Sequence, residues 1–67
     1  MEHQLFNIYL RHKGTNEEIS VQVWGMNEDR ATDKIVSVLC GAYGEYEWTD
    51  TKPVRDINNE LVTRRFY

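Results

Sequence analysis

The sequence is short of cysteine and of long apolar runs, and each shortage excludes a class of protein. Its single cysteine, Cys40, cannot form an internal disulfide, so the 67 residues have to fold on their apolar core alone. No run approaches the roughly 20 apolar residues that cross a bilayer, and the first residues lack the pattern of a secretory signal. We therefore expect one small domain, residues 1–67, that is soluble, cytoplasmic and without a membrane partner.

The sequence also has fewer basic than acidic residues. Eight lysines and arginines stand against eleven aspartates and glutamates, which gives a formal net charge of −3. Lysine and arginine supply most of the affinity for a phosphate backbone, so this balance disfavours general nucleic-acid binding. An acidic chain is better suited to a basic protein surface, although solubility alone also explains a charge of this size.

The residue types that carry catalysis or bind metals are few and dispersed. Cys40 is predicted to lie at the C-terminal end of a helix, where the helix dipole disfavours a thiolate. His3 and His12 fall at opposite ends of one predicted strand and cannot share a site. One cysteine and two histidines match no metal-ligand spacing. Gly41 and Gly44 follow a helix instead of preceding one, unlike a phosphate loop. We expect no enzymatic activity, cofactor or metal.

The stretch from Asn27 to Trp48 carries the strongest structural pattern. Asn27 is a good helix N-cap, and two acidic residues follow it at the positive end of the helix dipole. An apolar stripe then recurs at helical spacing, and Gly41 lies where a left-handed residue would end the helix. These signals predict a helix over residues 28–40. Its stripe comprises Ala31, Ile35, Val38, Leu39 and Ala42.

Two alternating segments precede the helix and two strands follow it. Residues 5–11 and 19–24 alternate apolar and polar side chains, which predicts a hairpin joined through residues 12–17. Matching their apolar faces places Leu10 opposite Ile19 and, on the other face, Leu5 opposite Trp24. Residues 45–49 predict a third strand, residues 50–56 a loop or irregular extension, and residues 57–61 a tight turn before a strand at 61–67.

The predicted fold is α+β with the order ββαββ. A right-handed crossover gives a four-stranded antiparallel sheet in the order 2-1-3-4, with the helix on one face. In the last strand the parity is open: either Val62 and Phe66 or Leu61 and Thr63 point inward. The predicted core comprises Phe6, Ile8, Leu10, Ile19, Val21, Val23, Ala31, Ile35, Val38, Leu39, Tyr46 and Trp48. A core this small is marginal, so a dimer or a bound partner would stabilise the fold.

A single helix leaves the other face of the sheet uncovered, and that face is the candidate binding surface. In the predicted register it carries Leu5, Tyr9 and Trp24, an aromatic and aliphatic composition typical of interface hot spots. Glu45 and Glu47 lie nearby as an acidic rim. The alternative for the apolar residues is a cluster that merely stiffens the hairpin, and for the two glutamates it is solvation of the sheet.

Two other interaction modes remain open. Arg55, Arg64 and Arg65, with the aromatic Tyr67, are the residues from which a small single-strand nucleic-acid platform would be built. Salt bridges between these basic residues and the neighbouring acids are the competing interpretation. A homodimer or structural homo-oligomer joined through an unpaired strand edge is the third alternative.

The hairpin, the helix start Asn27-Glu28-Asp29-Arg30-Ala31 and the strand Gly44-Glu45-Tyr46-Glu47-Trp48 together resemble small phage- or prophage-encoded proteins of strand–strand–helix–strand order. Anti-CRISPR proteins and inhibitors of bacterial RNA polymerase are examples. The resemblance implies a bacterial or infected host cell and a chain that blocks a host protein by occupying its surface. It assigns no functional residue. The sequence thus predicts a non-enzymatic protein-binding module, with a nucleic-acid-binding accessory protein as the alternative.

Overall fold

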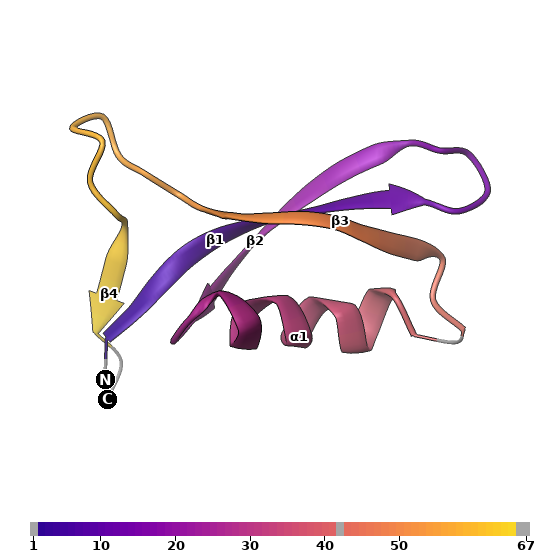
Figure 1. Cartoon of the computed structure of the whole chain (residues 1–67), viewed down its shortest axis with the longest axis horizontal. Coiled ribbons are helices and arrows are strands. Elements are labelled where there is room, and N and C mark those ends of the chain that lie inside the picture. Colours follow the sequence, from indigo (N-terminus) through magenta and orange to yellow (C-terminus); the bar gives the residue numbers. More distant parts are fainter. Residues whose placement is uncertain (1, 42, 66–67) are drawn as a thin grey trace.

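The computed structural model describes residues 2–41 and 43–65, which form one sheet with a helix beneath it (Figure 1). Two strands, the helix and two further strands follow one another along the chain. The elements are β1 (Glu2–His12), β2 (Glu18–Gly25), α1 (Glu28–Leu39), β3 (Tyr46–Pro53) and β4 (Thr63–Arg65). The predicted α+β class, the antiparallel sheet and the single helix are confirmed. Within the described residues, no helix is long and apolar enough to span a membrane.

The β1–β2 hairpin has the predicted register. Leu10 pairs with Ile19 on the helix side, and Leu5 pairs with Trp24 on the opposite face. At the far end of the hairpin the His12 imidazole Nδ1 accepts hydrogen bonds from the backbone of Gly14 and Thr15, at 3.1 and 3.3 Å. The alternation of apolar and polar residues specified this register, because a slip by one residue would expose the whole core set.

The position of the fourth strand differs from the prediction. The order β2-β1-β3 is confirmed, but β4 pairs with β1 instead of extending the sheet beyond β3. β1 begins at Glu2, earlier than its alternating segment indicated, and is 11 residues long. β3 pairs with residues 6–12 of β1, and β4 takes the remaining Glu2–Gln4 along the same side. The extra length of β1 therefore accommodates both strands.

The helix starts as predicted and ends differently. The Asn27 side chain accepts a 2.8 Å hydrogen bond from the Arg30 backbone, which satisfies one of the free donors of the first turn. The helix ends at Leu39, one residue before the predicted end, and Cys40 is its C-cap. Gly41 is not a left-handed cap, because none of the described glycines has a positive φ. Glycine is required at position 44 instead, because a Cβ there would collide with the Leu39 carbonyl oxygen.

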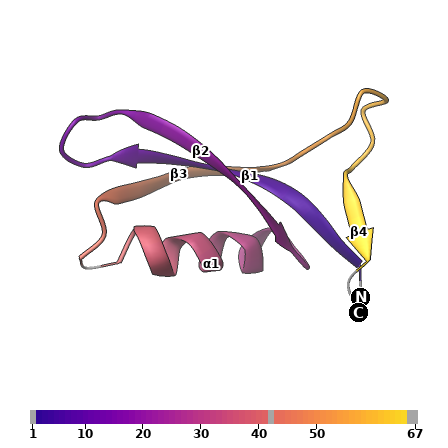
Figure 2. The same ribbon diagram turned by 180° about the vertical axis from the view of Figure 1, so that it is seen from behind.

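The core lies between α1 and the helix-side face of the sheet. Phe6, Ile8, Leu10 and Ala31 are buried, and the partly buried residues packed against them are Ile19, Val21, Val23, Ile35, Leu39, Cys40 and Tyr46. Two predicted core residues are not buried: Val38 is 73% exposed and Trp48 46% exposed. Val38 lies near the end of α1 where the hairpin rises away from the helix (Figure 2). Trp48 lies beside a register shift at the β3 edge of the sheet.

Candidate protein-binding surface

The face of the sheet opposite α1 has no helix or strand over it within the described part of the chain. Figure 1 shows α1 along one side of the sheet, while two connections rise on the other side: the β1–β2 hairpin at one end and the β3–β4 connection at the other. We call the uncovered side the open face and residues 54–62 the arm. The open face is therefore a sheet surface bounded by a raised segment at each end.

Leu5 and Trp24 lie side by side on the open face, and Leu5 is the residue to which the arm is bonded. They are direct cross-strand partners, and both side chains are half-buried. The arm is bonded to the same place, because the Leu5 carbonyl accepts from the Val54 backbone at 2.9 Å and the Leu5 N–H donates to the Val62 carbonyl at 3.0 Å. One predicted binding residue, Leu5, thus anchors both ends of the arm, and Trp24 lies beside it on β2.

The arm is held in shape by its own hydrogen bonds. The Asp56 carboxylate accepts from the backbone N–H groups of Asn58 and Glu60, at 2.8 and 3.1 Å. The Asn59 N–H donates to the Asp56 carbonyl, and Asn59 adopts a left-handed φ of 62°, which asparagine tolerates well. Ile57, in this turn, is 100% exposed. The turn predicted at residues 57–61 is confirmed, and its apolar residue projects into solvent.

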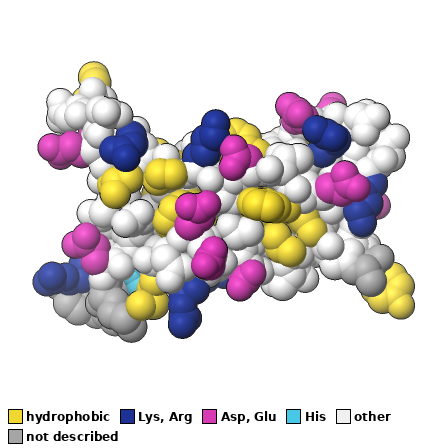
Figure 3. Space-filling model, in the orientation of Figure 1, with side chains coloured by type: hydrophobic (Ala, Val, Ile, Leu, Met, Phe, Trp, Pro, Cys, Tyr) yellow, Lys and Arg dark blue, Asp and Glu magenta, His cyan; other side chains and the backbone are white. Residues whose placement is uncertain are grey.

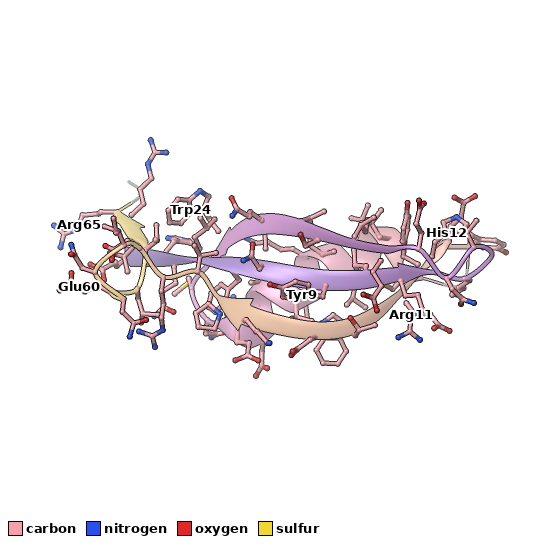
Figure 4. All side chains as sticks on the ribbon, turned by 90° about the horizontal axis from the view of Figure 1, so that it is seen from above. Tyr9, Arg11, His12, Trp24, Glu60 and Arg65 are labelled. Atoms are coloured by element: carbon pink, nitrogen blue, oxygen red, sulfur yellow. The ribbon has the colours of Figure 1, made fainter. Side chains whose placement is uncertain are left out.

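Tyr9 lies on the open face but apart from Leu5 and Trp24. Figure 4 shows Tyr9 and Trp24 at separate places along the sheet. Tyr9 follows Leu5 by four residues on the same strand, a separation of about 13 Å, and the Asn7–Gln22 pair lies between them. The Lys52 ammonium is 5.9 Å from the centre of the Tyr9 ring and 3.7 Å from the Asp50 carboxylate. A shallow pocket of about 240 Å³ surrounds this ring. Its lining residues are Tyr9, Leu10, Glu18, Thr49, Asp50 and Lys52.

The two predicted rim glutamates occupy different surroundings. Glu47 pairs with Arg11 across the sheet, and Arg11 also lies 3.7 Å from the Glu18 carboxylate. Glu45 precedes β3 and its carboxylate lies 3.4 Å from the His12 Nε2. The Glu45 side chain is 76% exposed. The acidic groups therefore lie at the hairpin end of the open face, away from Leu5 and Trp24.

The candidate nucleic-acid residues are not gathered on one surface. The Arg55 guanidinium donates to the Asn59 carbonyl at 2.9 Å and so braces the arm. Arg64 and Arg65 are successive residues of β4, so their side chains point to opposite faces. Tyr67 lies outside the described residues. On the surface seen in Figure 3, basic side chains are separated by acidic ones. Among the described residues on this face, the basic side chains do not form the continuous groove that tracks a strand of nucleic acid (Figure 3).

The reactive residue types also remain dispersed. Burial raises the pKa of the Cys40 thiol above its ordinary value, and the Glu47 carboxylate adds to this, while Lys13 and a hydrogen bond from the Trp48 backbone oppose it. Among the described residues, no three His, Cys, Asp or Glu side chains come together as a metal site would require. The described side chains of the open face are apolar, aromatic and charged.

Ile57 was missed as a candidate binding residue. The sequence places it in a polar turn, and an apolar residue among aspartate and asparagines was the available signal. Its exposure could not be predicted without knowing that the arm rises from the sheet.

No protein-family model, curated protein or solved structure matches the chain.

Proposed function

We propose that this chain is a non-enzymatic protein-binding module that contacts its partner with the open face and the arm. The observation that carries the proposal is that Leu5 and Trp24 are neighbours on the open face, and that the arm bonded to Leu5 presents a fully exposed Ile57 in its turn. Aromatic and aliphatic anchors of this kind dominate protein interfaces, because they bury a large area at little conformational cost. The proposed mode of action is occupation of the partner's surface.

The charges of the open face suggest the chemistry of the partner. In the hairpin half of the open face there are three carboxylates, of Glu18, Glu47 and Asp50, and two cations, Arg11 and Lys52. The fully exposed Ile57 lies in the arm, at the opposite end (Figure 1). A basic surface with an apolar depression complements both features, since charge steers the encounter and buried apolar contact supplies the affinity. Phage origin and inhibition of a host protein rest on the pattern resemblance and remain predictions.

The test compares two fully exposed apolar residues at different loops. Ile57 lies in the arm, and Tyr43 lies in the α1–β3 connection, on the helix side of the sheet. The wild-type chain is immobilised to capture a protein, which is identified and purified. Calorimetry then measures the Kd of that protein for the wild-type chain and for each variant. Ile57→Asp is expected to weaken binding at least about tenfold, the effect of losing a hot-spot contact, whereas Tyr43→Asp changes the Kd less than about twofold.

Two outcomes would overturn the proposal. If Tyr43→Asp weakens binding as much as Ile57→Asp does, the partner does not contact the arm specifically. If Ile57→Asp binds like the wild type and Trp24→Ala, folded by circular dichroism, does so too, the open face is not the interface. The far-ultraviolet spectra and melting temperatures of all variants serve as controls for folding.

A further inference from the structure

The outer edge of β2 presents backbone groups to which no described strand is bonded. Within the described residues β2 pairs only with β1, so its other side has no strand beside it. The His12 N–H donates to the Glu17 carbonyl, which identifies that pair as one bonded toward β1. Because bonded and non-bonded pairs alternate in an antiparallel ladder, the backbone groups of Glu18, Ser20, Gln22 and Trp24 point outward. The Lys34 ammonium caps the last of these, donating to the Trp24 carbonyl at 2.8 Å.

The two long edges of the sheet differ in how they are protected. β3 contains a register shift opposite Tyr9 and Leu10, a lysine at position 52 and a proline at position 53. Bulges, lysines and prolines are devices that natural sheets use to prevent edge pairing. β2 has the sequence EISVQVWG, with no lysine or proline, and its eight residues pair with β1 without a shift. β2 is therefore the edge that can accept another strand.

An apolar strip accompanies this edge on the helix side. Ile19 and Val21 are only half-buried although they point toward α1. Val38 is 73% exposed, and it lies one helical turn after Lys34, which reaches the β2 edge. Figure 2 shows this side of the molecule, with α1 and the rising hairpin diverging from each other. A strand placed beside β2 would cover these apolar groups as well as the backbone.

We propose that a second copy of this chain pairs with β2, antiparallel and centred on Ser20, so that two sheets become one. This inference goes beyond the proposed function and does not depend on it, since it uses the backbone edge of β2 and not the anchors Leu5 and Trp24 or the arm. Centring on Ser20 joins the three outward residues that Lys34 does not cap, and Lys34 marks where the pairing ends.

The side chains of β2 are compatible with their own copies in this register. Ser20 meets Ser20 of the second copy, and Glu18 meets Gln22, so no like charges lie opposite each other. On the helix side Ile19 meets Val21, which extends the apolar face across the junction. The core contains only four buried apolar residues, Phe6, Ile8, Leu10 and Ala31, and such a small core gains stability from this added burial.

Sedimentation velocity over a range of concentrations tests the proposal. The wild type is expected to shift from the 8.0 kDa chain toward twice that mass below a concentration of about 1 mM. Ser20→Lys places two ammonium groups opposite each other at the centre of the pairing, and should weaken the dimer at least about tenfold. Asn7→Lys is the matched control: it adds the same charge on the same face but on β1, and should leave the dimer constant within about twofold.

A cross-link supplies the second measurement. In a Cys40→Ser background, Ser20→Cys should oxidise to a disulfide-linked dimer, because paired Cα atoms of an antiparallel ladder lie about 5.5 Å apart. A wild type that stays monomeric at about 1 mM would refute the proposal. So would a dimer that Ser20→Lys leaves intact, one that Asn7→Lys disrupts equally, or a Ser20→Cys variant that dimerises without cross-linking.

Discussion

At the scale of single residues, Thr51 shows how the edge of the core is built. Its side chain is only 5% exposed in a position that the alternation of β3 would give to an apolar residue. The hydroxyl accepts a 2.8 Å hydrogen bond from the Trp48 indole and shares another of 2.8 Å with Thr32 of α1. Thr51 thus joins β3 to α1 and orients Trp48 at the same time.

Replacing Thr51 with valine should lower the free energy of unfolding by about 1–3 kcal/mol, because it deprives Trp48 and Thr32 of their common partner. Urea denaturation followed by circular dichroism measures the change. Thr63→Val, at an exposed position of β4, is the matched control and should alter the stability by less than about 0.5 kcal/mol. Equal effects at the two positions would show that Thr51 is not a structural link.

Cys40 should react slowly with alkylating reagents. Burial raises the pKa of its thiol, so the reactive thiolate is scarcer in the folded chain than in the unfolded one at the same pH. The alkylation rate measured from pH 7 to 10 should therefore increase with a midpoint at higher pH in buffer, where the chain is folded, than in concentrated urea, where it is unfolded. The raised pKa also makes stability depend on pH. Folding favours the neutral Cys40 thiol, so its contribution to the free energy of unfolding is lost as the pH rises through the folded-state pKa. A midpoint below that of the unfolded chain would contradict this assignment.

At the scale of elements, the sequence specified whatever depends on neighbouring residues. The hairpin register follows from alternation, and the start of α1 follows from Asn27, whose cap requires only local geometry. The position of β4 was not predictable in this way. It depends on how far β1 extends toward its start, where Glu2, His3 and Gln4 show no apolar alternation, and on the direction in which the arm turns.

The same distinction holds for the candidate site. Leu5, Tyr9 and Trp24 were placed on the correct face by their parity. The separation of Tyr9 from Leu5 and Trp24 could also have been predicted, because the polar residues Asn7 and Gln22 lie between them. The exposure of Val38 required the curvature of the sheet, which no local pattern encodes. The role of Ile57 required the orientation of a whole segment.

The arm should depend on Asp56 for its rigidity. Asp56→Ala removes the acceptor of the Asn58 and Glu60 N–H groups, so hydrogen exchange of these two amides should accelerate at least about tenfold while the core strands keep their protection. Asp56→Asn keeps a side-chain oxygen and is the control, with exchange close to the wild type. Unchanged exchange in Asp56→Ala would mean that the Arg55 bond and the Arg55–Leu61 bridge hold the arm by themselves.

At the scale of the whole molecule, one helix covers one face of a sheet and leaves two surfaces for which we propose different uses (Figure 1). The face opposite α1 carries the anchors and the raised arm, and the unprotected β2 edge offers backbone pairing. The proposed partner surface and the proposed pairing edge share Glu18, but the anchors Leu5 and Trp24 and the arm lie outside the paired residues 18–22. The architecture therefore allows a paired assembly that displays two partner surfaces.

The two tryptophans lie on opposite sides of the sheet, which provides a direct test of where the partner binds. Trp24 is opposite Leu5 on the open face, and Trp48 is opposite Leu10 on the helix side. The chain is labelled with 5-fluorotryptophan, its two fluorine signals are assigned with a Trp48→Phe variant, and the purified partner is added. We predict that the Trp24 signal shifts and the Trp48 signal does not. A shift of Trp48 with an unchanged Trp24 would contradict binding at the open face.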